Sequence, residues 1–155
     1  MKTNIDNVST AYKAFALRSL GFWRSTRQYT HYEKDGKVQH FNCCTYFQVD
    51  GDWDDFSIRW GPNMDMNEGG MRAIYDNGIL HIDRNYFEDG NPTDRIVKST
   101  ENGIVLVTKV KDVIYNEAMW FPDQSYDIRI RQNIGYYTDV SVAMVGQYTE
   151  TRIEN

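Results

Sequence analysis

A carboxylate and two guanidinium groups lie close together in the sequence between Tyr115 and Asn133, on either side of a short turn. Glu117 belongs to the run Tyr-Asn-Glu-Ala-Met-Trp-Phe, and Arg129 and Arg131 follow a Pro-Asp-Gln-Ser turn in the run Asp-Ile-Arg-Ile-Arg. Alternate side chains of an extended strand share a face, so a hairpin of these two runs can present all three charged groups together. Such a hairpin could bind an anionic ligand.

The second of these strands can be oriented in two ways. In one orientation Ile128, Ile130 and Ile134 face the core, and the two arginines are solvated. In the other the arginines face a cavity, where they need an anionic partner because a buried, unpaired guanidinium is very costly. The residues alone leave both orientations open.

Composition excludes several classes of partner. The 155 residues, 41% of them hydrophobic, fit a single domain over 1–155 with a sizeable core. A net charge of −5 without a long basic run argues against nucleic acid and acidic membrane surfaces as partners. No apolar run approaches the ~20 residues of a membrane span, and the N-terminus lacks the apolar core of a secretion signal. We therefore expect a soluble, intracellular protein.

The usual motifs of metal and nucleophile chemistry are missing. Cys43 and Cys44 are adjacent in a strand-like run, so they point to opposite faces, and a structural role is favoured over a catalytic thiol. The three histidines are scattered without the spacing of a metal site, and we expect no bound metal. A glycine-rich phosphate loop and a Gly-x-Ser-x-Gly elbow are also absent from the sequence.

The elements that position these residues are one helix and about ten strands. Helix formers fill Ser9–Leu20, with Ser9 or Thr10 as the N-cap and Gly21 as the stop. Turn signals such as Asp-Gly and Asn-Gly then separate short strand-like runs. This pattern predicts an all-β antiparallel barrel or sandwich. The expected strands are Phe22–Tyr32, Phe41–Val49, Phe56–Trp60, Met71–Tyr75, Ile79–Phe87, Arg95–Ser99, Ile104–Val110, Val113–Phe121, Asp127–Ile134 and Val140–Tyr148.

A barrel of eight to ten strands can hold one small ligand, with the helix as a plug at one end. Tyr115, Glu117 and Met119 share a strand face that mixes aromatic, charged and thioether groups, as do Arg84 and Tyr86. Mixed faces suit an amphipathic ligand. For each face taken singly, a solvent-exposed surface with a few aromatics is the alternative.

The chain resembles the S-type phycobiliprotein bilin lyases along nearly its whole length. That family has a Glu-x-x-Trp-Phe strand, a short turn and a Leu-Arg-x-Arg-like strand, which correspond here to Glu117–Phe121 and Ile128–Arg131. Weaker similarities occur in the same order elsewhere in the chain, at Trp23–Arg27, Ile58–Met66, Gly78–Tyr86, Arg95–Val97 and Tyr148–Ile153.

The resemblance implies a lipocalin-like antiparallel β-barrel of about ten strands with a short N-terminal helix. It implies an enzyme, a lyase that binds a linear tetrapyrrole and attaches it by a thioether bond to a cysteine of a phycobiliprotein subunit. We expect phycoerythrobilin as the bilin, with phycocyanobilin as the alternative, and an apo-subunit of phycoerythrin as the acceptor. The bilin is the substrate, so no separate cofactor is expected.

The same resemblance implies the cell in which the protein works. We expect the cytoplasm of a cyanobacterium, or of one infected by a cyanophage, with a plastid stroma as the alternative. A homodimer is left open.

The residues that match the family's pocket are Arg27, Met64, Met66, Glu117, Arg129 and Arg131. A bilin has propionates, pyrrole nitrogens and flat apolar rings. Arginines suit the propionates, a carboxylate suits the pyrrole N–H groups, and aromatic or thioether groups suit the ring faces. We expect Glu117 to pair with the pyrrole nitrogens and donate a proton, and Arg129 and Arg131 to bind propionate. Tyr115, Met119 and Asn133 complete the expected substrate-binding set.

Some residues depart from the family pattern. The turn before Arg129 is about two residues longer, Met66 stands at a typical tryptophan, and Asn133 replaces a hydroxyl residue. These departures leave the bilin preference open. Because neither cysteine lies in the Glu/Arg hairpin, we expect the bilin to be held noncovalently. The alternative function is a carrier for a bilin or another amphipathic ligand, without a transfer step.

Overall fold

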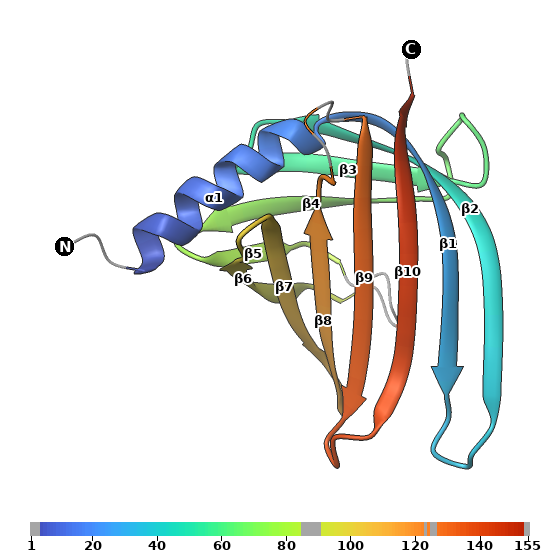
Figure 1. Ribbon diagram of the computed structural model, residues 1–155. Helices are drawn as coiled ribbons and strands as arrows, with labels where there is room; N and C mark the ends of the chain where they lie inside the picture. The colour runs from blue at the N-terminus through green and yellow to red at the C-terminus, as the bar shows by residue number, and fades with distance from the viewer. Residues whose placement is uncertain (1–3, 85–90, 123, 125–126, 154–155) are drawn as a thin grey trace.

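Ten antiparallel strands form a closed barrel, and one helix lies across one end of it (Figure 1). The computed structural model describes residues 4–84, 91–122, 124 and 127–153. Each strand pairs with its neighbours in sequence, and β1 closes the barrel against β10. The elements are α1 (Asn4–Ser19), β1 (Gly21–Tyr32), β2 (Val38–Gly51), β3 (Asp55–Gly61), β4 (Gly69–Asp76), β5 (Ile79–Ile82), β6 (Thr93–Ser99), β7 (Gly103–Val110), β8 (Val113–Trp120), β9 (Ile128–Tyr137) and β10 (Val142–Ile153).

The expected all-β, lipocalin-like barrel with an N-terminal helix is thus confirmed, and the differences concern element ends. The helix begins at Asn4, and the hydroxyl of Ser9, an expected N-cap, instead lies 2.7 Å from that of Tyr75. The last strand begins after Val140, which has a φ of 62° in a tight turn and cannot extend the ladder. That strand continues to Ile153 because its pairing with β1 continues that far.

Two further strand ends also differ from the expectation. The second strand begins three residues earlier, since pairing with β1 reaches Val38. The fifth strand ends at Ile82, and residues 85–87 of the expected strand lie outside the described part of the chain. No helix in the described ranges is both long enough and apolar enough to cross a membrane.

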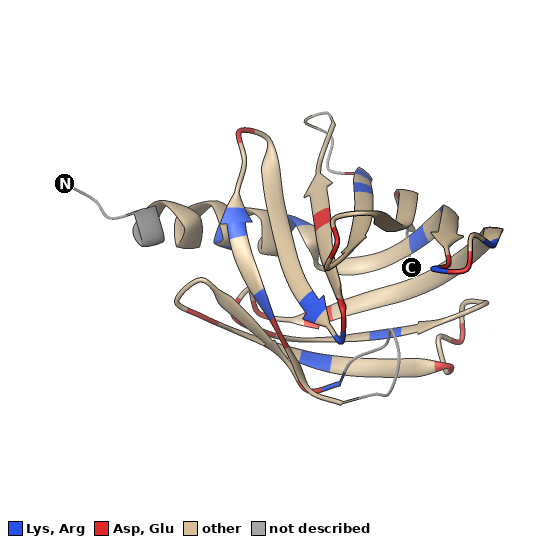
Figure 2. Ribbon diagram, turned by 90° about the horizontal axis from the view of Figure 1, so that it is seen from below, with Lys and Arg blue, Asp and Glu red and all other residues tan. Residues whose placement is uncertain are grey.

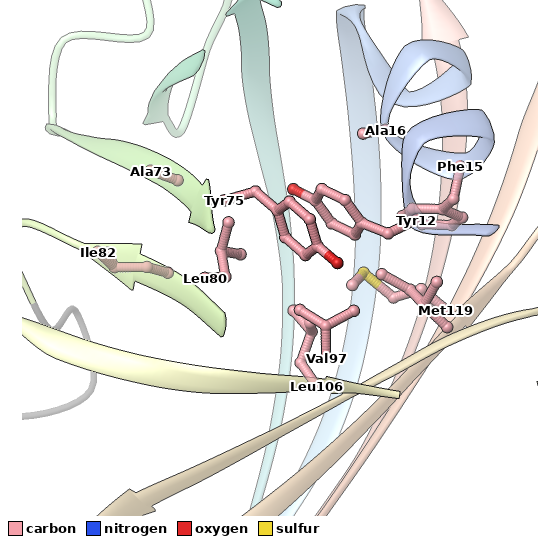
Figure 3. Close-up of a cluster of buried hydrophobic side chains, with 11 residues drawn as sticks. Tyr12, Phe15, Ala16, Ala73, Tyr75, Leu80, Ile82, Val97, Leu106 and Met119 are labelled. Atoms are coloured by element: carbon pink, nitrogen blue, oxygen red, sulfur yellow. The ribbon is translucent and has the colours of Figure 1, made fainter. Parts of the chain in front are cut away.

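The helix closes its end of the barrel with an aromatic face. Tyr12, Phe15 and Ala16 recur at helical spacing and are buried against strands β4 to β8 (Figure 3). Within this cluster the ring of Tyr12 stacks on that of Tyr75, with centroids 4.2 Å apart and an interplanar angle of 15°. Burial of a large side chain such as Phe15 contributes about 1.5–3 kcal/mol, so this face fixes α1 on the barrel.

Two inward-facing glycines leave space for tyrosine rings against the barrel wall. A Cβ atom at Gly135 would lie 2.9 Å from the ring of Tyr115, its register partner on β8. A Cβ atom at Gly146 would lie 2.7 Å from the hydroxyl oxygen of Tyr148. Glycine at these positions therefore allows both rings to lie flat over the neighbouring backbone.

Candidate ligand-binding site

The barrel encloses a cavity whose wall is partly apolar and partly charged. Phe56, Met71, Leu80, Ile104 and Met119 are among its apolar lining residues. The charged part of the wall is supplied by strands β1, β6, β8 and β9, and charged residues occur within strands as well as in loops (Figure 2). The cavity volume is about 130 Å³. Pockets that enclose a drug-sized ligand usually measure ~300–1,000 Å³, so this one would enclose only part of such a ligand.

Glu117 faces the interior from the middle of β8, on the same strand face as Met119. Its side chain is 6% exposed, and its Oε1 atom lies 3.8 Å from Nη1 of Arg131 and 4.0 Å from Nη1 of Arg95. On β9, Arg129 is 5% exposed, whereas the neighbouring Ile128 is 36% exposed. Of the two orientations open from the sequence, the observed one therefore has the arginines facing the cavity.

Arg129 is held mainly by the protein itself. Its Nε atom donates to Oε1 of Glu150 at 2.8 Å, its Nη2 atom lies 2.7 Å from the same oxygen, and its Nη1 atom donates to the hydroxyl of Ser19 at 3.0 Å. The guanidinium also lies 5.3 Å from the ring centroid of Trp23. Ser19 is the last residue of α1, so Arg129 ties the end of the helix to β10. This arrangement favours a structural role over the expected contact with propionate.

Glu150 is fully buried at the centre of this charge network. Burial alone would raise the pKa of its carboxyl, but the guanidinium groups of Arg129, Arg131 and Arg27 outweigh burial and lower the pKa to about 2. Glu150 is therefore ionised at neutral pH. The register places it between Arg129 on β9 and Ser25 on β1, which is also fully buried.

Arg131 lies between the two glutamates without closing on either. Its Nη2 atom is 3.8 Å from Oε2 of Glu150, the same separation as that between its Nη1 atom and Glu117, and longer than a hydrogen bond. Its guanidinium lies 4.5 Å from the ring centroid of Tyr148, and that of Arg27 lies 5.3 Å from the same centroid. Tyr148 thus supports two guanidinium groups from its place on β10.

Positive charge is in excess in this part of the interior. Four guanidinium groups, those of Arg27, Arg95, Arg129 and Arg131, accompany the two carboxyl groups of Glu117 and Glu150. Among the described side chains of this region, four positive charges thus accompany two negative ones when both glutamates are ionised. A buried excess of this kind suits a ligand with two acidic groups, because uncompensated charge in a low-dielectric interior is costly.

Asn133 provides a hydrogen-bond acceptor that no described group satisfies. It is 1% exposed, its Oδ1 atom has no hydrogen-bond partner, and it lies opposite Glu117 in the β8–β9 register. A buried acceptor without a donor costs about 1–3 kcal/mol. Together Asn133 and Glu117 suit a ligand that brings N–H donors, while the arginines suit its acidic groups.

The remaining predicted residues divide into two groups. Met119 lines the cavity, and Tyr115 is half-buried over Gly135 on the inner wall. Met64 and Met66 lie on the connection between β3 and β4, where Met64 is exposed and Met66 is buried, and neither is among the residues that line the cavity.

Two buried charged residues and one thiol were not assigned to the site from sequence. Arg95 reaches Glu117 from β6, and Glu150 reaches the arginines from β10. Glu150 lies on the same face of its strand as Tyr148, and the preceding positions on this face are apolar. A charged residue on an apolar face was the available signal. Arg95 gave no such signal, because both faces of its strand mix apolar and polar residues. Cys43, expected outside the site, is the register partner of Arg27.

Comparison with known proteins adds evidence on the fold. No family model and no curated protein matches this chain. Among solved structures, the chain is similar to the S-type phycobiliprotein lyase of Guillardia theta, with 15% identity and a TM-score of 0.60 over 100% of this chain and 99% of that one. It is also similar to a Nostoc punctiforme protein of unknown function from the DUF3598 family, with 15% identity and a TM-score of 0.57 over 89% of this chain and 49% of that one. At such low identity these likenesses show a shared fold.

Proposed function

We propose that this protein binds a linear tetrapyrrole in its barrel and attaches it to a cysteine of a phycobiliprotein subunit, as a chromophore lyase. The observation that carries the proposal is the meeting of one carboxylate, Glu117, with several guanidinium groups on the wall of an otherwise apolar cavity. Asn133, buried opposite Glu117 just behind this wall, offers a second acceptor. The shared fold with a phycobiliprotein lyase supports the same assignment.

Each part of the ligand has a matching partner in the site. The two propionates would add negative charge beside the arginines, and Arg131, which lies 3.8 Å from each of two carboxylates, would bind one of them. The pyrrole N–H groups can donate to Glu117 and to the Oδ1 atom of Asn133. Apolar ring faces suit Met119, two residues from Glu117 on β8, and Leu106, the register partner of Glu117 on β7.

The chemistry is an addition without a leaving group. The acceptor thiol loses its proton, its sulfur forms a bond to the ethylidene or vinyl carbon of the bilin, the carbon–carbon π bond breaks, and the chromophore takes up one proton. No oxidant or reductant is needed. Glu117, paired with the pyrrole nitrogens, would favour the protonated and more electrophilic chromophore, and the cavity would fix the face open to attack.

We further propose phycoerythrobilin as the bilin and a phycoerythrin subunit as the acceptor. The test is to mix the protein with phycoerythrobilin or phycocyanobilin, first alone and then with candidate apo-subunits. Noncovalent binding should appear as an absorbance change, and transfer as a zinc-fluorescent acceptor band on a denaturing gel. Binding without transfer to any acceptor would indicate the carrier instead, and the absence of binding to every bilin would overturn the proposal.

A further inference from the structure

The β1–β2 hairpin extends beyond the closed part of the barrel. Pairing between these strands continues to Tyr32 and Val38, and β10 supports β1 as far as His31. Among the described strands, however, β3 pairs with β2 only over residues 46–51. Figure 1 shows the hairpin continuing beside β10, away from α1. Its inner face therefore extends the barrel wall beyond the last residue pair that β2 makes with β3, and its tip is held by Lys34, which pairs with Asp112 in the β7–β8 turn.

Three rings are gathered on this inner face, and we call them the shelf: Tyr29, His31 and Phe41. The rings of Tyr29 and Phe41 are stacked, with centroids 5.1 Å apart and an interplanar angle of 20°. The ring of His31 meets both edge-on, at 5.4 and 5.5 Å. Phe41 is 39% exposed. A stacked aromatic pair that remains accessible on a concave wall offers a flat surface for another ring.

The shelf is continuous with the charged cavity. Strand alternation places Ser25, Arg27 and Tyr29 on one face of β1, and Arg27 lines the cavity. The pair Tyr29–Phe41 lies two residues beyond the pair Arg27–Cys43, a distance of about 7 Å along the strands. A flat ligand anchored at Arg27 therefore reaches the shelf with its next ring.

The size of the cavity favours such an extension. At about 130 Å³ the cavity is smaller than pockets that enclose ligands of the size of a tetrapyrrole, which measure ~300–1,000 Å³. A cavity of this size encloses only part of a tetrapyrrole, so a place for one ring outside it is favoured. A reacting ring outside the cavity is also accessible to the acceptor cysteine, which belongs to another folded protein.

We propose that the shelf holds the terminal pyrrole ring that carries the ethylidene or vinyl group, outside the enclosed cavity and open to the acceptor thiol. This inference rests on the proposed function and specifies where the reacting end of the ligand lies. Tyr29 and Phe41 position that ring by stacking, and Arg27 anchors the propionate nearest to it. The shelf residues are positioning residues.

Two adjacent cysteines make the test specific. Cys43 lies on the inner face directly opposite Arg27 and two residues from Phe41 of the shelf, whereas Cys44 lies on the outer face, where its sulfur accepts a hydrogen bond from Arg24. In the Cys44→Ser and Cys43→Ser variants, the remaining thiol is alkylated with iodoacetamide, with and without phycoerythrobilin. We expect the bilin to slow alkylation of Cys43 and to leave the rate at Cys44 unchanged.

A matched pair of substitutions tests the stacking itself. Phe41→Ala should weaken bilin binding about 3- to 10-fold and slow transfer to the acceptor, whereas His40→Ala, on the outer face beside Thr30, should do neither. If the bilin binds normally but neither protects Cys43 nor requires Phe41, the shelf is overturned while the proposed function stands. If no bilin binds to the unaltered protein, both are overturned.

Discussion

Arg129 and Arg131 point into the same barrel interior from alternate positions of β9, yet they meet their partners at different distances. Arg129 contacts Glu150 at 2.7–2.8 Å and donates to Ser19, while Arg131 stays 3.8 Å from each of two carboxylates. The first geometry is that of a hydrogen-bonded ion pair, and the second is that of a cation shared at longer range between two carboxylates. This difference separates two residues that the sequence presents as equivalent.

Alanine substitutions at these two positions should therefore have different effects. Arg131→Ala should weaken bilin binding by about 1.5–3 kcal/mol, the usual contribution of a hydrogen bond to a charged partner. Arg129→Ala should lower the free energy of unfolding by about 3–5 kcal/mol, because it leaves Glu150 buried and less well compensated. Absorbance titration and urea denaturation measure the two effects. Equal loss of binding without loss of stability in both variants would contradict the assignment.

The ionisation of Glu150 should make the free energy of unfolding depend on pH. Its pKa is lowered to about 2 in the folded protein, so the ionised carboxylate stabilises the fold at any pH above the ordinary value. That contribution, about 3 kcal/mol, is lost as the pH falls from about 4.5 to about 2. Glu150→Gln should remove this dependence and be less stable at neutral pH.

Urea denaturation at pH 7 and at pH 3 checks this expectation. The stability gap between the unaltered protein and Glu150→Gln should narrow at pH 3, and the exposed control Glu68→Gln should follow the unaltered protein at both values. If the two proteins differed by the same free energy of unfolding at both pH values, Glu150 would not titrate as described.

The Oδ1 acceptor of Asn133 should contribute to bilin binding, whereas an asparagine on the outer face of the barrel should not. Asn133→Ala removes a buried oxygen that lacks a hydrogen-bond partner, so bilin binding should weaken about 3- to 10-fold, as for one neutral hydrogen bond. Asn116 lies on β8 at an outward position and provides a matched control. If Asn116→Ala weakened binding as much as Asn133→Ala, the loss would reflect a change in the barrel and not a lost contact.

The site was partly predictable because strand alternation is a local property. Glu117 and Met119 share a face by alternation alone, and turn signals located the ten strands to within a few residues in most cases. Alternation does not say which face is inside, so the sequence left the orientation of Arg129 and Arg131 open. The structure of the closed barrel shows it.

The rest of the site depends on contacts between distant parts of the chain. Ser19 and Arg129 are 110 residues apart, and Glu150 meets Arg129 across the β9–β10 register. The register that sets Cys43 opposite Arg27 is likewise fixed by pairing along the whole β1–β2 hairpin. No single segment contains this information, and for that reason Arg95 was missed.

The central claim, that Glu117 pairs with a bound tetrapyrrole and promotes its transfer, is tested most directly by Glu117→Gln. That substitution keeps the shape of the side chain and removes its charge. The measurement is the rate at which a zinc-fluorescent thioether forms on a phycoerythrin apo-subunit, with the absorbance of the bound bilin recorded in parallel. We predict that the variant retains much of its affinity, shows a blue-shifted spectrum and transfers the bilin about 100-fold more slowly or with the wrong stereochemistry. A spectrum and a transfer rate equal to those of the unaltered protein would contradict the account.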